Sequence, residues 1–208
     1  KGKLLRNIKL KVKKSSPHRD TRLVRKLQNG HYLVAHEGDG FVREYDADGK
    51  VTWEYAVPLF DRKRKGGHGL EAWGNQVFAA IRLPNGNTLI STGNGHAVLE
   101  VTKEKKIVWH LKQNDLPGIR LAWVTTLEML PNGNFVIGNC HAGSQYPQII
   151  EITREKKVVW TFKNFDKLGN SLSNSTLIDP LKDVAFFNDK VEPILRKNCY
   201  KCHGTRDK

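Results

Sequence analysis

The stretch LPNGNTLISTGNGHAVLEVTKEKKIVW, residues 83–109, contains two turn signals and ends on a tryptophan. Its Asn-Gly pair is typical of tight hairpin turns, because these residues accept positive φ values. The segment KEKK is a second polar break before the last apolar residues. Periodicity and turn signals together predict four short strands, over roughly 77–83, 88–92, 97–102 and 106–111. Four consecutive antiparallel strands are typical of one propeller blade.

This pattern occurs three times. An Asn-Gly turn begins at Leu27, Leu83 and Leu130, and a tryptophan follows after 26, 26 and 30 residues, at Trp53, Trp109 and Trp160. A period near fifty residues with four strands per unit indicates a β-propeller. We expect the tryptophans to pack between neighbouring blades. The fold class is therefore mainly β, with about three four-stranded blades in a partial propeller over 1–180, and repeats at about 20–60, 75–115 and 121–165.

The composition is ordinary for a soluble globular protein, with 38% apolar and 27% charged residues among 208. No apolar run approaches the ~20 residues of a membrane span, so we expect no transmembrane segment in this chain.

The net charge of +14 is concentrated in residues 1–26, which hold eleven basic residues and one acid. Such a strip can bind nucleic acid or anionic lipid. However, NIKLKVKK at 7–14 alternates apolar and basic residues, which predicts a half-buried strand. This strand could be the last strand of an earlier blade. We favour the strand and expect no nucleic-acid partner, because no nucleic-acid-binding motif accompanies the charge.

Five histidines are predicted to lie on one face of the propeller. The loops between second and third strands and those between blades share this face, opposite the Asn-Gly turns. His36, His96 and His141 follow second strands, and His18 and His68 precede first strands. Gathered imidazoles can hold a metal or cofactor or perform acid–base chemistry. The alternative is ordinary polar loop chemistry, and no fixed ligand spacing of known zinc sites is present.

The sequence CYKCH at 199–203 carries a more specific signal. Cys199 and Cys202 are spaced to form thioethers with haem c, and His203 is placed to bind the haem iron as proximal ligand. A zinc knuckle or a redox dithiol uses similar spacing. The zinc site needs a second ligand pair nearby, and the dithiol needs a βαβ context. Neither is present, which favours haem.

A helix is predicted immediately before this motif. Phe187, Val191, Ile194 and Leu195 are spaced i, i+4, i+7 and i+8, as on one helix face. Pro193 falls near the first turn, where proline is tolerated best. Such a helix would lead directly into the two cysteines.

FNDKVEPILRKNCYKCHG, residues 187–204, resembles the opening of planctomycete-type cytochrome c domains. This resemblance implies a c-type cytochrome domain beginning in 181–208 and truncated here. Residues 20–165 resemble PQQ-like, arylsulfotransferase-like propeller repeats, with YDADGKVTWEY at 45–55 close to the Gly-Lys-x-x-Trp half of their motif. The glycine that usually closes the quinoprotein motif is missing after all three tryptophans, which argues against PQQ as cofactor.

Together these features predict a haem c-binding electron-transfer protein with a propeller as binding or docking module. A quinoprotein-type dehydrogenase that passes electrons to haem c is the alternative, and a pure interaction propeller is a third hypothesis. The partner is a redox protein or a small-molecule substrate. Since bacterial haem c is attached outside the cytoplasm, we expect a periplasmic or otherwise exported protein, with any signal peptide upstream of Lys1.

Overall fold

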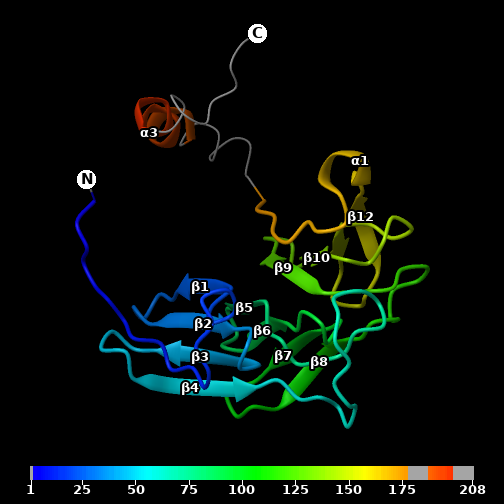
Figure 1. Ribbon diagram of the computed structural model, residues 1–208, viewed down its shortest axis with the longest axis horizontal. Coiled ribbons are helices and arrows are strands. Elements are labelled where there is room, and N and C mark those ends of the chain that lie inside the picture. Colours follow the sequence, from blue (N-terminus) through cyan, green and yellow to red (C-terminus); the bar gives the residue numbers. More distant parts are fainter. Residues whose placement is uncertain (1, 178–186, 199–208) are drawn as a thin grey trace. The chain divides into compact units, whose positions relative to one another are not determined.

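The structure is a computed structural model that describes residues 2–177 and 187–198 (Figure 1). The chain divides into two compact units, Lys1–Ser175 and Thr176–Lys208. Every strand of the described residues belongs to the first unit.

The first unit consists of three antiparallel sheets, each with four strands in chain order. The first blade contains β1 (Leu23–Lys26), β2 (Tyr32–His36), β3 (Phe41–Tyr45) and β4 (Val51–Ala56). The second contains β5 (Ala79–Arg82), β6 (Thr88–Ser91), β7 (Val98–Val101) and β8 (Ile107–Leu111). The third contains β9 (Val124–Met129), β10 (Phe135–Asn139), β11 (Ile149–Ile152) and β12 (Val158–Phe162). The predicted mainly-β class with three four-stranded blades is confirmed.

Both predicted turns are present in each blade, and each contains a residue with positive φ. The glycine of the first turn has a positive φ in every blade, at Gly30, Gly86 and Gly133. The turn before each fourth strand also contains one positive φ, at Gly49, Lys105 and Lys156. The three blades are therefore equivalent in the sign of φ at both of these turn positions.

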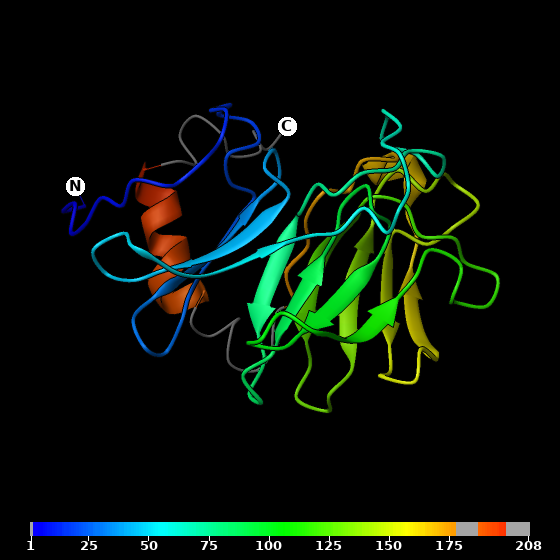
Figure 2. The same cartoon turned by 90° about the horizontal axis from the view of Figure 1, so that it is seen from below.

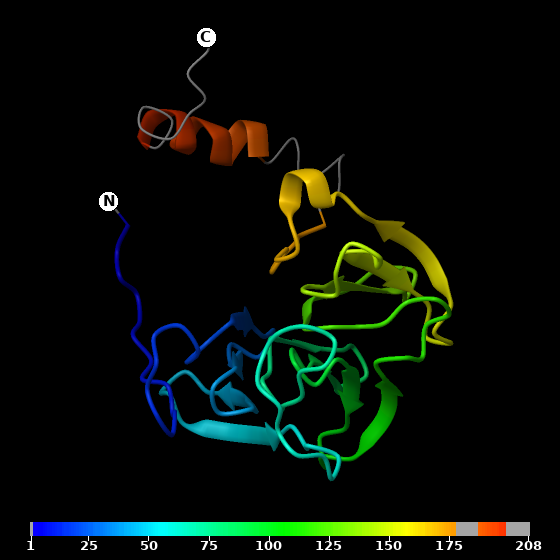
Figure 3. The same cartoon turned by 45° about the vertical axis from the view of Figure 1, so that its right-hand side comes forward.

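The blades pack face to face through two apolar clusters. Leu33 and Val42 of the first blade meet Ile90 and Leu99 of the second. A second cluster joins the second blade to the third and includes Leu111 and other buried side chains. Figure 2 shows the second and third sheets (green to yellow) side by side, and Figure 3 shows the three sheets following one another in chain order. The core of this unit therefore lies between sheets.

The tryptophans of the fourth strands contact the next blade, as expected, in two of three cases. Trp53 Nε1 donates a hydrogen bond to the Lys103 carbonyl at 2.9 Å, and Trp109 Nε1 donates to the Arg154 carbonyl at 2.8 Å. Each acceptor lies in the turn before the fourth strand of the following blade. Trp160 differs, because its side chain is 48% exposed.

The basic segment at 7–14 is not a β-strand, contrary to the prediction. It has no regular secondary structure, and its apolar residues are half-buried while its lysines are exposed. Its backbone bonds to side chains of the first blade instead of a neighbouring strand: Lys11 N donates to Tyr45 Oη, and the Lys11 carbonyl accepts from Arg43. The alternation predicted burial correctly, but a strand assignment also requires a partner backbone with matching free groups.

In the described residues after the last strand, three short helical segments are present. Helix α1 (Phe165–Leu168) belongs to the first unit, whereas η1 (Phe187–Val191), a π-helical turn, and α3 (Glu192–Asn198) belong to the second. The helix predicted before the cysteines is therefore confirmed. Within the described residues, no helix is long and apolar enough to cross a membrane.

Candidate functional site

Backbone hydrogen bonds hold the loop between the second and third strands of each blade. In the first blade, Gly38 N donates to the Arg19 carbonyl of the incoming loop at 2.9 Å, and in the second, Gly74 N of the incoming loop donates to the Asn94 carbonyl. In the third blade, His141 N donates to the Asn170 carbonyl of the segment that leaves β12. These loops contain His18, His36, His68, His96 and His141, with His36 as the last residue of β2. We call this side of the unit the histidine face.

His36 is fully buried and forms two hydrogen bonds. Its Nδ1 lies 2.6 Å from the Asp20 carbonyl, and its Nε2 lies 2.9 Å from Tyr45 Oη. Because a carbonyl can only accept, Nδ1 carries the proton and Nε2 accepts from the tyrosine hydroxyl. Burial lowers the pKa of His36. This histidine joins the incoming loop to the first blade and presents no group to a ligand.

His96 is equally buried and has the opposite tautomer. Trp123 N donates to His96 Nδ1 at 3.0 Å, so the proton is on Nε2, which lies 2.7 Å from the Ala72 carbonyl. Burial lowers the pKa of His96, and nearby Arg62 and Arg120 lower it further. The imidazole connects the second blade to the backbone of the segment that enters the third.

His68 and His141 are brought together by the fold. Their ring centroids are 5.0 Å apart, and His68 also meets the ring of Trp123 edge-on at 4.4 Å. His68 is exposed and His141 is half-buried, while Trp123 is buried beneath them. Burial lowers the pKa of His141, and the neighbouring charge of His68 lowers it further. This His68–Trp123–His141 cluster is the accessible part of the predicted face.

The cluster is built on backbone that side-chain-bearing residues rarely adopt. Trp123 has φ of 43°, and His141 and His96 have φ of 63° and 51°. Such conformations cost on the order of 1–3 kcal/mol each and concentrate at functional sites. The sequence predicted the histidines, but it did not single out Trp123. The signal for Trp123 is its backbone torsion, which only the fold shows.

The other polar residues of this face serve the structure. His18 Nε2 lies 2.9 Å from Arg22 Nη2, whose Nε bonds to the buried Glu37. Asn139 accepts from Ala122 N and donates to two backbone carbonyls. Burial raises the pKa of the Cys140 thiol to about 11, so the thiol is protonated at neutral pH. Cys140 is a small core residue.

A groove of about 440 Å³ opens on the same face. Aromatic rings line much of it: Phe60 stacks on His110, with ring centroids 4.9 Å apart, and the guanidinium of Arg62 covers Trp73 at 3.5 Å from the ring centroid. Lys112 and Asp115 also line it. Aromatic walls with a few charged groups suit a ligand that has both apolar and polar parts. Sequence reasoning missed this groove, because its walls come from three separate loops.

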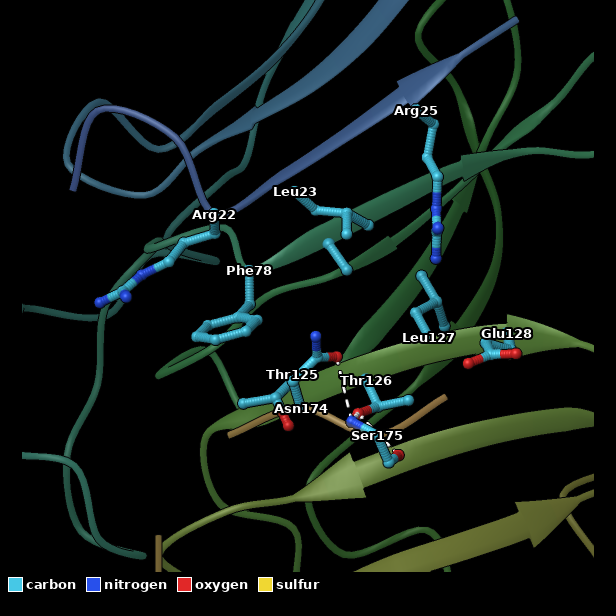
Figure 4. A pocket seen from close by; sticks show the side chains of 11 residues that line it. Arg22, Leu23, Arg25, Phe78, Thr125, Thr126, Leu127, Glu128, Asn174 and Ser175 are labelled. Carbon is cyan, nitrogen blue, oxygen red and sulfur yellow. Dashed lines mark hydrogen bonds between the residues drawn. The ribbon is translucent and has the colours of Figure 1, made fainter. Parts of the chain in front are cut away.

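The first strands of the blades enclose a much smaller cavity, shown in Figure 4. Leu23, Phe78 and Thr125 contribute to its lining, and Ser175 closes one side by donating from N and Oγ to Thr126 Oγ1. Its volume of about 20 Å³ is close to the space that a single water needs. The groove on the histidine face is therefore the more suitable place for a ligand.

Among residues 2–177 and 187–198, no group of three or more His, Cys, Asp or Glu could hold a metal ion. The haem attachment residues Cys199 and Cys202 and the iron ligand His203 lie outside the described residues. The structure shows the helix that leads to them, α3, which ends at Asn198.

Several solved structures are similar to this chain. The chain is similar to a protein of unknown function from Bacteroides caccae, with 27% identity and a TM-score of 0.60, over 74% of this chain and 53% of that one. A WD40 β-propeller domain matches at 11% identity and TM-score 0.49, covering 69% of this chain and 40% of the other. Virginiamycin B lyase from Staphylococcus aureus matches at 13% identity and TM-score 0.48, covering 71% and 42%.

The chain spans about half the length of these solved structures, or less. Neither a protein-family model nor a curated protein matches it. The architecture is defined by the three four-stranded sheets of the structure itself.

Proposed function

We propose that this protein is a haem c-binding electron-transfer protein whose propeller is a binding or docking module. The observation that carries the proposal is the motif CYKCH at 199–203, directly after α3 (Glu192–Asn198). Two thiols separated by two residues, followed by an imidazole, are the donor set of covalent haem attachment. Bound haem c supplies one-electron transfer at its iron.

The residues of this chain have distinct parts in the proposal. Cys199 and Cys202 form the thioethers, and His203 holds the iron on the proximal side. Phe187 and Ile194 of the preceding helical segment are 40% and 60% exposed, so they offer apolar surface at the entrance to the motif. This arrangement matches the resemblance of 187–204 to the start of cytochrome c domains. It also implies an exported protein, since haem c is attached outside the bacterial cytoplasm.

The propeller contributes the surface that meets the redox partner or substrate. Two features on the histidine face support this role: the His68–Trp123–His141 cluster and the groove beside Trp73. Aromatic and cationic side chains that remain accessible are typical of binding surfaces. His36 and His96 do not contribute to this binding surface, because both are buried and hydrogen-bonded.

Haem attachment is tested by expression with a haem c maturation system, followed by a denaturing gel with haem stain. Replacement of both Cys199 and Cys202 by Ala should abolish the stain. The matched control is Cys140→Ala, which removes a buried thiol in the third blade and should leave the stain unchanged. Persistence of the stain in the double variant would show that haem is not attached at this motif.

The docking role is tested separately by the rate of haem reduction with a periplasmic fraction of the native host as donor. His68→Ala with His141→Ala should slow reduction several-fold, whereas ascorbate should reduce both proteins equally. Glu104→Gln with Glu155→Gln alters two exposed turns distant from the cluster and serves as the control. Equal rates for both pairs would remove the histidine face from the proposal.

Stoichiometric release of PQQ on denaturation would instead favour the quinoprotein alternative.

A further inference from the structure

The two contacts between blades follow one rule. In each, the fourth-strand tryptophan donates to the carbonyl that lies six residues before the tryptophan of the next blade: Trp53 to Lys103, and Trp109 to Arg154. A glutamate directly across the sheet from each tryptophan pairs with an arginine of the next blade. These pairs are Glu44 with Arg82 at 2.7 Å and Glu100 with Arg154 at 2.5 Å.

The third blade has the same groups in the same register. Glu151 lies across from Trp160, and Asn134 Nδ2 donates to Glu151 at 2.7 Å, just as Asn87 donates to Glu100 at 2.6 Å. In the part of the chain that the structure describes, Trp160 Nε1 has no hydrogen-bond acceptor and Glu151 has no arginine partner. Among the described residues, the ring of Trp160 stacks on Phe162 alone, with ring centroids 6.3 Å apart.

The chain that leaves β12 already covers the inner part of this face. Ser175 donates from both N and Oγ to Thr126 of β9, at 2.9 and 3.0 Å, and Gln148 donates to the Gly169 carbonyl. The outer part stays open, where Val158 and Trp160 are 37% and 48% exposed. The open surface is therefore the part that a third and a fourth strand of a further blade would cover.

We propose that the outer face of the third blade binds a fourth blade of the same repeat, in cis. That blade would present a backbone carbonyl to Trp160 Nε1 and a basic side chain to Glu151. A second copy of this chain is a poorer occupant. Its matching surface is the free face of the first blade, where Arg43 and Tyr45 are already covered by the backbone at Lys11.

The first test compares equivalent tryptophans in the 208-residue chain by urea unfolding. Trp109→Phe removes the hydrogen bond to Arg154 and should lower the unfolding midpoint, whereas Trp160→Phe should leave it unchanged. Trp160→Lys should also be tolerated, and Trp109→Lys should not. A lowered midpoint for Trp160→Phe or loss of folding in Trp160→Lys would overturn the proposal, because Trp160 would then already be part of a formed interface.

The second test supplies a blade. A copy of residues 121–165, whose turn contains an equivalent of Arg154, is joined in frame after Ser175. Iodide quenching of Trp160 should fall, and Trp160→Phe should now lower the midpoint about as much as Trp109→Phe. Unchanged quenching in the folded extended chain would contradict the proposal. A Trp160-dependent dimer of the 208-residue chain, seen by light scattering, would assign the face to a second copy and would equally overturn it.

Discussion

His36 and His96 show how the surroundings of a residue decide its role. Both are buried, and each uses its two ring nitrogens to join separate segments of backbone or side chain. His68 and His141 are the same residue type on the same face, yet they meet each other and leave ring surface accessible. The difference arises from the two loops that cross near Trp123, and not from the local sequence.

Stability should fall in mild acid because His96 is neutral in the fold. Burial lowers its folded pKa below the ordinary value of 6.5. As the pH falls below about 6.5, His96 becomes protonated in the unfolded chain but stays neutral in the folded chain. The free energy of unfolding therefore falls until the pH reaches the folded pKa. His96→Gln keeps an acceptor for Trp123 N and a donor for the Ala72 carbonyl. It should therefore reduce the loss measured by urea unfolding between about pH 7.5 and pH 5.5.

The control is His68→Gln, which alters an exposed imidazole on the same face. It should retain the acid-dependent loss of stability. An unchanged pH dependence in His96→Gln would mean that other groups, such as His36, account for the effect.

At the scale of the element, a blade is defined by turn residues and by close approach between its strands. Gly138 lies in β10 at an irregularity in its pairing with β9. A Cβ at this position would overlap Thr125 Oγ1 and come within 2.9 Å of Thr126 N. Glycine is therefore required where the backbones of β9 and β10 approach closely, because a side chain would fit there only if one strand moved.

Gly138→Ala should lower the free energy of unfolding by roughly 1–3 kcal/mol, the usual cost of overpacking in a core. Thermal or urea unfolding measures this directly. Gly66→Ala is the matched control, since its Cβ would meet nothing within 4 Å. Similar stability for the two variants would show that β9 and β10 can separate without cost.

For the molecule as a whole, the basic N-terminal segment stabilises the first blade. Its backbone supplies an acceptor to Arg43, a donor to Tyr45 and, at Lys13, a donor to Asp39. Arg43 is 2% exposed and also bonds to Asp39 and Glu54. The segment thus completes a buried polar network that would otherwise be left partly unsatisfied.

Removal of residues 1–14 should destabilise the first unit by about 2 kcal/mol, since three hydrogen bonds to buried or half-buried groups are lost at about 1 kcal/mol each and water replaces part of them. Lys9→Gln with Lys13→Gln tests the charge alone, because the backbone contacts remain. This pair should change the unfolding midpoint little. If the pair matched the truncation, the charge and not the backbone would be the source of stability.

The sequence by itself determined the blades of this protein. Period, Asn-Gly turns and equivalent tryptophans are local signals, since a hairpin turn and the strands beside it are specified by neighbouring residues. The helix before Cys199 was predicted for the same reason, from its 3.6-residue periodicity. Only the tertiary structure decided which histidines are structural and which are accessible, that Trp123 lies beneath two of them, and that the segment at 7–14 pairs with no strand among the described residues. These properties depend on contacts between residues tens of positions apart, and no local pattern encodes which groups meet when sheets pack face to face.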